Sequence, residues 1–446
     1  MTRISLFTSN FKRIWKYLLA AMLTIMGVLA VYRGLSFLLV EEDLWARLMW
    51  HSYYAQDENI DNLFLGSSHV YCDINPEVLD NMTGETNFNL ATASLNLDGA
   101  YYLLREADKM HDLKAVYLEM YYMGAVVANE RKFNDVTNDW RNLDYMKWST
   151  NKLDYFLEVS GPTMYADTLF PMLRFRSEIG NAEHIVEQIR TKQNEDYLNY
   201  RCINLEKGTN IQYCDKGFMY RDGLFEEKDW HGIQTCVEGE NYLGETAEYY
   251  LRQIIEYCQD RDIDITLFSS PVTNLQVIAD GKYDDYVKDI NGLVNEYGIE
   301  YYDFNLCKTE YLPLNQESSY SDDDHLNAKG AAEFTELFGY VMKQTFQENA
   351  KYFHESYVEK LLKEEPFVYG IVRLKNSEEG NYMVISNQEI GMEYEITLWN
   401  ENDESRLLQY YSENKTFYVE DTDKKCEVKV RKKGTIEPIQ ELLVEL

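Results

Sequence analysis

The chain has 446 residues, of which 45% are apolar, and a formal net charge of -33. This length exceeds one average domain and the apolar fraction is typical of globular proteins, so we expect two folded units and not a disordered chain. The chain has 76 acidic and 43 basic residues, and this acidic excess argues against nucleic acid and anionic lipid headgroups as partners of the globular part. The seven cysteines lack zinc-ligand spacing, and Cys202 and Cys214 could pair if the chain is exported.

The N-terminus has the pattern of a membrane anchor. Residues 1–16 carry four basic side chains and are expected to form a cytoplasmic tail, while 17–40 are apolar or small apart from Arg33. A helix over 17–40 would span about 36 Å, enough to cross a bilayer. Acidic residues 41–43 follow, and this charge order predicts a single-pass protein with the bulk of the chain extracytoplasmic. A cleaved signal peptide is the alternative, but the apolar run is long for one and no small-x-small site follows.

Residues 41–59 are expected to form an amphipathic linker, and an alternation of strands and helices follows over 60–350. The sequence predicts strands at 61–65, 87–91, 114–121, 264–269 and 300–304. It predicts helices at 76–82, 97–111, 244–261, 280–297 and 327–347. Apolar strands between amphipathic helices indicate an α/β fold with a parallel sheet covered on both faces. The pattern loosens over 123–243, which we interpret as an insertion at the carboxyl edge of the sheet. This insertion would serve as a lid or a substrate wall, or it would be a structural excursion that only packs against the domain.

The C-terminal part, residues 366–446, changes to a period of two. Short apolar-polar alternations are separated by turn residues such as Gly380 and Gly434. This pattern predicts a small antiparallel β-sandwich as an accessory domain. A spacer or docking role suits it better than carbohydrate contact.

The first chemical signal is the turn that follows the strand at 61–65. Apolar residues run into Gly66-Ser67-Ser68, and Asn75-Pro76 further on is typical of a helix start. A serine placed in this way lies at the carboxyl edge of a sheet, where open α/β sheets build their sites. Taken alone, a serine-rich strand–helix turn is the simpler interpretation.

The second signal is Asp322-x-x-His325, directly before the helix predicted at 327–347. An aspartate three residues before a histidine on a tight turn can accept the imidazole Nδ1–H, which leaves the other nitrogen free as a general base. One alternative is an acidic cap of the following helix. Another is a metal site, but the glycine and spacing of a calcium loop are missing, so neither a metal nor a cofactor is expected.

A serine after the first strand and Asp-x-x-His before the last helix resemble the SGNH/GDSL hydrolase superfamily over roughly residues 60–347. The residues that carry the resemblance lie at 66–68, 89–94 and 322–330. It implies a flavodoxin-like three-layer fold, with Ser68 as nucleophile, His325 as base and Asp322 as its orienting partner. The Ser68 backbone N–H is then expected to be one oxyanion donor.

Two motifs depart from the pattern of that superfamily. Its second-block glycine, an oxyanion donor through its N–H, falls at Ser94 or Ala91, and a backbone donor survives either replacement. Its third-block Gly-x-Asn is not visible. Losing one oxyanion donor typically costs a factor of about 10²–10³ in rate, so Tyr121, Tyr122 or another group would have to substitute.

The Ser-Ser variant with an N-terminal apolar helix is also similar to membrane-anchored extracytoplasmic relatives such as the D-alanyl transfer protein and alginate-type O-acetyltransferases. This resemblance implies a serine esterase or O-acyltransferase acting on acyl groups of a cell-surface glycan or envelope polymer, with a membrane-bound acyl-donor protein as a partner. Hydrolysis and transfer stay open. We expect Asn89 to line the pocket, and His69 either to line it or to be structural. The alternative function is a weakly active or inactive scaffold that binds glycan or assembles other proteins.

Overall fold

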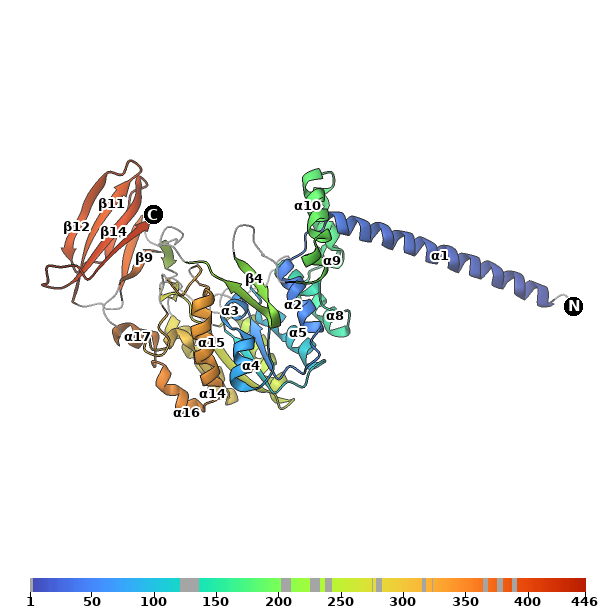
Figure 1. The fold of residues 1–446 in the computed structure, drawn as a ribbon, viewed down its shortest axis with the longest axis horizontal. Helices are drawn as coiled ribbons and strands as arrows, with labels where there is room; N and C mark the ends of the chain where they lie inside the picture. The colour runs from blue at the N-terminus through green and yellow to red at the C-terminus, as the bar shows by residue number, and fades with distance from the viewer. Residues whose placement is uncertain are drawn as a thin grey trace.

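The computed structural model describes residues 3–120, 136–201, 210–224, 233–236, 243–274, 276–277, 283–314, 318–322, 324–363, 368–374, 380–386 and 391–446. A long helix, α1 (Arg3–Leu39), projects from one side of a globular body, and a β-rich unit lies at the opposite end (Figure 1). Within α1, the segment Arg13–Leu39 has a mean hydropathy of 1.9 and is long and apolar enough to cross a membrane.

A five-stranded parallel sheet forms the centre of the body, as the sequence predicts. Its order is β2-β1-β3-β7-β8, and its strands are β1 (Asn62–Gly66), β2 (Asn87–Ala91), β3 (Ala115–Glu119), β7 (Asp264–Ser269) and β8 (Glu300–Asp303). Counted within this sheet, the order is 2-1-3-4-5, which is the flavodoxin-like arrangement. Ligands bind such sheets outside the carboxyl ends of the strands where the order reverses, here between β1 and β3.

Helices cover both faces of the sheet. On one face α4 (Pro76–Thr83) and α15 (Ala328–Met342) pack together, and on the other α5 (Leu97–Asp108) packs against α12 (Glu245–Gln259). Phe338 of α15 lies within 5.6 Å, ring to ring, of Phe64, Tyr117 and Phe268, which belong to three neighbouring strands. Truncating such a fully buried ring typically costs about 3–5 kcal/mol, so this contact fixes the helix on the sheet.

The helix α14 and several short elements complete this domain. They are α3 (Ser68–Asp73), α14 (Tyr283–Tyr297), η4 (Phe304–Leu306), α16 (Phe346–Asn349), η5 (Ala350–Tyr352) and α17 (Tyr357–Lys363). Asn75 caps α4 as expected, because its side chain accepts the Glu77 N–H at 3.1 Å.

The segment expected as a linker, 41–59, differs from that expectation. It contains α2 (Leu44–Tyr54), which Asp43 caps by accepting the Ala46 N–H at 2.9 Å. Trp50 and Tyr53 of α2 are fully buried in the main apolar core, where the Tyr53 hydroxyl donates to the Glu106 carbonyl. An amphipathic pattern cannot distinguish a surface connection from a helix that lays its apolar side into a core.

The region interpreted as an insertion forms several small elements. They are α7 (Trp140–Leu143), α8 (Thr150–Val159), α9 (Tyr165–Leu169), η2 (Pro171–Glu178), α10 (Ala182–Gln193), α11 (Glu195–Leu198), β4 (Ile211–Cys214), η3 (Asp215–Gly217) and β5 (Phe218–Arg221). The helices α8 to α10 lie on the side of the body that α1 leaves, while β4 and β5 form a hairpin near α3 (Figure 1). The Cys202–Cys214 pairing falls outside the described residues, because Cys202 is not among them.

The C-terminal unit is an antiparallel sandwich, as predicted, with one parallel addition. Its two four-stranded sheets have the orders β13-β10-β9-β6 and β12-β11-β14-β15 and share one apolar cluster. The strands are β9 (Val368–Leu374), β10 (Asn381–Ser386), β11 (Met392–Asn400), β12 (Ser405–Ser412), β13 (Thr416–Tyr418), β14 (Asp423–Lys432) and β15 (Gln440–Glu445). The additional strand β6 (Ile233–Cys236) comes from the insertion and pairs parallel with β9, so the insertion reaches the accessory unit.

Candidate active site

The chain turns sharply where β1 ends and α3 begins. A Cβ atom added to Gly66 would lie 2.5 Å from the Glu119 Cβ and 2.7 Å from a Val70 methyl, so only glycine fits between the strand and the helix. Ser67 then caps α3, its hydroxyl accepting the His69 N–H at 3.3 Å. This turn leaves Ser68 as the first residue of α3, at the carboxyl edge of the sheet.

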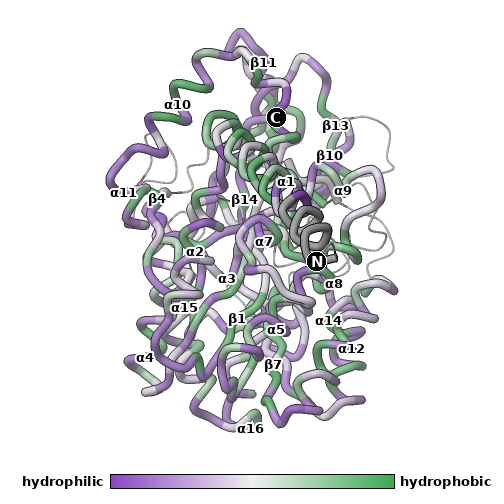
Figure 2. The backbone as a smooth tube through the Cα atoms, turned by 90° about the vertical axis from the view of Figure 1, so that its right-hand side faces the viewer, coloured by the Kyte–Doolittle hydropathy of each residue, from purple (hydrophilic) through white to green (hydrophobic). Residues whose placement is uncertain are grey.

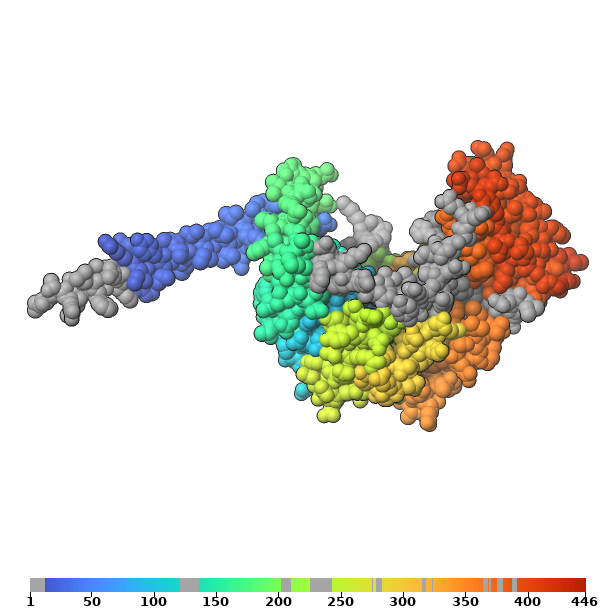
Figure 3. Space-filling model, turned by 180° about the vertical axis from the view of Figure 1, so that it is seen from behind, coloured from blue at the N-terminus to red at the C-terminus, as the bar shows by residue number. Residues whose placement is uncertain are grey.

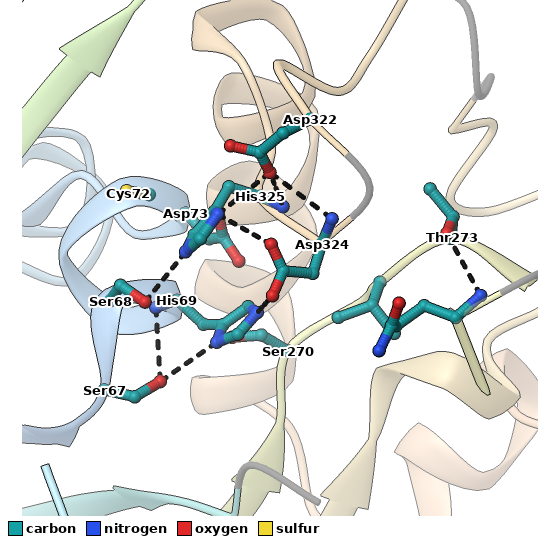
Figure 4. Close-up of polar contacts among 12 residues, drawn as sticks. Ser67, Ser68, His69, Cys72, Asp73, Ser270, Thr273, Asp322, Asp324 and His325 are labelled. Carbon is teal, nitrogen blue, oxygen red and sulfur yellow. Dashed lines mark hydrogen bonds and ion pairs between the residues drawn. The ribbon is translucent and has the colours of Figure 1, made fainter. Parts of the chain in front are cut away.

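The loop before α15 brings His325 to Ser68. The His325 Nε2 lies 2.7 Å from the Ser68 Oγ, and its Nδ1 lies 2.9 Å from the Asp322 Oδ1 (Figure 4). The same Asp322 oxygen accepts the His325 backbone N–H at 2.8 Å, which closes the tight turn that the spacing predicts. Arg221 of β5 binds the other Asp322 oxygen at 2.9 Å, so the carboxylate is held on both sides.

A second carboxylate, which the sequence interpretation did not single out, also reaches His325. The Asp324 Oδ1 lies 2.8 Å from the same Nδ1 that bonds to Asp322. Burial disfavours the imidazolium, but the hydrogen bonds to Asp322 and Asp324 outweigh it and hold the pKa of His325 well above its usual value. His325 therefore binds protons more tightly than an ordinary histidine.

A second serine–histidine pair lies directly behind the first. The Ser67 Oγ is 2.9 Å from the His69 Nδ1 and donates to the Glu119 Oε2 at 2.9 Å, which also accepts the Ser67 N–H at 3.0 Å. The His69 ring stacks on the His325 ring, with centroids 4.8 Å apart, and its Nε2 lies 3.8 Å from Asp324 (Figure 4). The two pairs therefore share one aromatic contact and one carboxylate.

The second pair is buried, and its histidine differs from His325 in charge. Burial, aided by the positive charge of His325, lowers the pKa of His69 to about 4. Burial also raises the pKa of Glu119 to about 7, against the hydrogen bonds from Ser67 that lower it. At neutral pH His69 is thus uncharged, and Glu119 titrates.

A pocket of about 460 Å³ opens beside Ser68. One wall is residues 41–45, which comprise the end of the α1–α2 connection and the start of α2, and another is the β4–β5 hairpin with Met219 and Arg221. Trp45 packs against Tyr71 of α3 at 4.4 Å between ring centroids, which gives the pocket an aromatic side next to the Ser68 hydroxyl. The insertion therefore supplies part of the wall of this pocket.

The expected oxyanion donors are less well defined. Ser94 is exposed with a φ of 55°, and Ala91 is the buried last residue of β2, whose carbonyl accepts from the Trp45 indole at 3.5 Å. Neither lines the pocket; Ala93, which lies between them, does. Tyr121 and Tyr122 lie outside the described residues.

Two other expected pocket residues have structural positions. The Asn89 amide donates to the carbonyls of Val70, Ile74 and Gly217, so it ties α3 to the β4–β5 hairpin. Asn89 is not among the residues that line the pocket beside Ser68; its buried amide instead binds backbone carbonyls in the interior. His69 is 1% exposed and lies behind His325, which is the structural alternative considered for it.

His69, Asp324 and His325 offer ligand atoms within 4.8 Å of one another and are a metal-like grouping among the described residues. Both ring nitrogens of His325 already make hydrogen bonds, to Ser68 and to the two aspartates. A metal ion would have to displace these contacts, so the residues fit a proton-transfer network better than a metal site.

No protein-family model and no curated protein matches this chain. Among solved structures, the chain is similar to a putative acylhydrolase from Bacteroides fragilis, at 10% identity and a TM-score of 0.30, with 68% of this chain and 98% of the other covered. It is similar to the same degree to a GDSL-like lipase from Bacteroides thetaiotaomicron, at 10% identity and a TM-score of 0.30, with 67% and 98% covered.

Proposed function

We propose that the protein is a membrane-anchored, extracytoplasmic serine esterase or O-acyltransferase of the SGNH type. Ser68, His325 and Asp322 are its proposed catalytic residues. The observation that carries the proposal is the continuous contact from Asp322 through His325 to the Ser68 hydroxyl, at 2.9 and 2.7 Å, beside a pocket at the switch point of the sheet.

In the proposed mechanism the Ser68 Oγ attacks the carbonyl carbon of an ester while the His325 Nε2 takes its proton. The Ser68 N–H and a backbone N–H of the turn at 91–94 receive the developing oxyanion. His325 then gives the proton to the leaving alkoxide, and an acyl group stays on Ser68. Water or a sugar hydroxyl, deprotonated by His325, attacks this acyl-enzyme and releases the serine.

The substrate proposed is an acylated glycan or cell-envelope polymer carrying acetyl-like esters. The pocket beside Ser68 is lined by charged and by apolar side chains, with Arg221 and the acidic residues 41–43 among the first and Trp45 and Met219 among the second. Transfer to a second hydroxyl, with acyl groups supplied by a membrane-bound donor protein, follows the same chemistry as hydrolysis. The acceptor that reaches the acyl-enzyme decides between them.

Contacts at the end of α1 support its retention as an anchor rather than its removal as a signal peptide. The amine of Lys192 donates to the carbonyls of Phe37 (3.0 Å) and Val40, and His184 bonds to the Leu39 carbonyl at 2.8 Å. These carbonyls lie at the C-terminal end of a helix, where no intrahelical donor reaches them. Cleavage near this point would leave the buried Lys192 without its acceptors.

A serine-directed fluorophosphonate tests the proposal on the full chain in detergent micelles. We expect covalent labelling of the unmodified protein and of Ser67→Ala, a matched control one residue away, and no labelling of Ser68→Ala. Turnover of a simple acetyl ester should follow the same pattern. Labelling that persists in Ser68→Ala, or a folded protein that never reacts, would contradict the assignment and favour an inactive glycan-binding or assembly scaffold.

A further inference from the structure

The helices around the exit of α1 expose an unusual amount of apolar surface. Within residues 136–201, α8 and α9 with their flanks carry Trp148 (68% exposed), Leu153 (45%), Leu157 (51%), Leu169 (38%) and Phe170 (48%). By contrast, Met110 is the one large apolar side chain so exposed within 41–120. Exposed apolar residues gathered on one face mark an interaction surface.

The helices that carry these side chains lie on the side of the body from which α1 projects (Figure 1). Figure 2 looks onto that side and shows α8, α9 and α10 arranged around the base of α1. In Figure 3 the residues coloured teal to green form the edge of the body next to the helix. We call Trp148, Leu153, Leu157, Leu169 and Phe170 together the α8–α9 face.

A contact with α1 sets the level of this face along the helix. The Phe170 ring lies 6.0 Å from the Tyr32 ring, edge to face. Tyr32 precedes the end of α1 by seven residues, or about 10 Å at 1.5 Å per residue. Phe170 therefore lies well toward the N-terminal side of the point where α1 enters the body.

The pattern of α1 places the outer boundary of a bilayer at the same level. Trp15 and Tyr32 are separated by 17 residues, or about 26 Å, close to the roughly 30 Å of a hydrocarbon core. Aromatic residues are enriched at both membrane–water boundaries, and Arg33 directly follows Tyr32. The last two turns of α1 would then stand above the hydrocarbon, packed against η2 and α10.

The attachment of this region to α1 is firm. Lys192 and His184 of α10 bind the carbonyls at the end of the helix, and Leu39 and Val40 are buried. A tilt of α10 relative to α1 would break these hydrogen bonds. Together with the contact between Phe170 and Tyr32, they hold the α9 end of the α8–α9 face at one level on the anchor.

We propose that the α8–α9 face lies in the outer boundary of the same bilayer that α1 crosses, with Phe170 and Leu169 in contact with lipid beside Tyr32. The partner is the lipid surface itself, because the face is continuous with the apolar helix and level with its outer aromatic residue. The inference rests on the anchoring role proposed for α1. It adds that the body lies on the membrane and does not swing on a tether, so the pocket wall at 41–45 faces esters close to the bilayer.

Depth measurement by electron paramagnetic resonance tests this in full-length protein reconstituted into phosphatidylcholine vesicles. Spin labels are placed one at a time at Leu157→Cys, Phe170→Cys, Met26→Cys on α1 and Ile436→Cys, which is 84% exposed in the C-terminal unit. The unsubstituted chain gives the background from native cysteines. Circular dichroism confirms that each labelled chain is folded.

We expect the labels at 157, 170 and 26 to collide more with dissolved oxygen than with a water-soluble nickel complex, and the label at 436 to do the reverse. Labels at 157 and 170 that behave like 436, with 26 still in lipid, would overturn the inference and leave the anchor intact. Low collision with both reagents at 157 and 170 would show a protein contact, such as a second copy, and would overturn it too. A water-exposed label at 26 would refute the anchor as well, while fluorophosphonate labelling of Ser68 judges the catalytic assignment separately.

Discussion

Two serine–histidine pairs lie side by side at the end of β1, and their environments differ in almost every respect. Ser68 faces a pocket and its histidine bonds to two carboxylates, whereas Ser67 is 4% exposed and its histidine is uncharged. The pKa of His325 is held well above normal, while burial lowers that of His69 to about 4. Adjacent residues thus have opposite properties because the turn at Gly66 directs one hydroxyl outward and the other inward.

The comparison teaches that a hydroxyl–imidazole contact alone does not make a nucleophile. In the proposed mechanism, the outer pair is distinguished by its position beside the pocket and by the charged partners that stabilise the imidazolium formed during attack. The inner pair instead supports the outer one. Glu119 holds Ser67, Ser67 contacts His69, and the His69 ring stacks on the His325 ring.

The largest expected effect comes from exchanging each histidine for glutamine. His325→Gln removes the proposed base and should lower kcat for a simple acetyl ester by on the order of 10³-fold. His69→Gln should lower kcat by less than about tenfold, because it disturbs only the support of the His325 ring. Equal losses of kcat in the two variants, measured at the same pH on folded protein, would contradict the different roles assigned to the two pairs.

An intermediate effect is expected from the two aspartates. Because both accept from the His325 Nδ1, Asp322→Asn and Asp324→Asn should each lose activity by about tenfold, and the double variant should lose far more than the product of the two. A single variant as inactive as the double one would show that one carboxylate does all the orienting.

The same variants should change the pH profile. A general base must be uncharged, so kcat/KM rises as pH rises through the pKa of His325, which lies well above 6.5 in the intact site. Removing Asp324 takes away one stabilising hydrogen bond to the imidazolium and should move this rise to lower pH. A profile that stays in place in Asp324→Asn would contradict the shared role.

The smallest effect on turnover, but a clear one on stability, is expected from Glu119→Gln. The folded-state pKa of Glu119, about 7, exceeds its ordinary value of 4.5. Its contribution to stability is therefore fully present below pH 4.5 and is lost as pH rises through 7. Between pH 4.5 and 8 the melting temperature of the unmodified protein should fall relative to that of Glu119→Gln. A difference in melting temperature that stays constant with pH would refute the raised pKa.

The sequence predicted the parts of this site that depend on order and spacing. Ser68 follows the first strand, Asp322 and His325 lie three residues apart on one turn, and the order of the two segments along the chain, through the resemblance to the SGNH/GDSL superfamily, indicated that they meet. Asp324 was not predicted, since neighbouring aspartates can be told apart only when the backbone of the turn is known. Glu119 was not predicted either, because its partner, Ser67, is 52 residues away and adjacent only through the pairing of β1 with β3.

Other misses have equally specific causes. Ala93 lines the pocket between the two positions matched to a family glycine, because the turn after β2 does not keep strand alternation. Helix α2 was interpreted as a linker because its buried stripe has the same periodicity as that of a surface helix. The architecture of the sheet was predictable because strands buried on both faces are nearly continuous in apolar residues.

The position of α2 bears on how a water-soluble form of this protein can be prepared. Trimming the chain at residue 60 would strip Trp50 and Tyr53 from the interior and remove the pocket side at 41–45. Cutting at 41 would spare both but take away the carbonyls that Lys192 needs. The chain should therefore be shortened inside the apolar helix, upstream of Tyr32, so that the remaining turns of α1 stay as a structural part of the soluble protein.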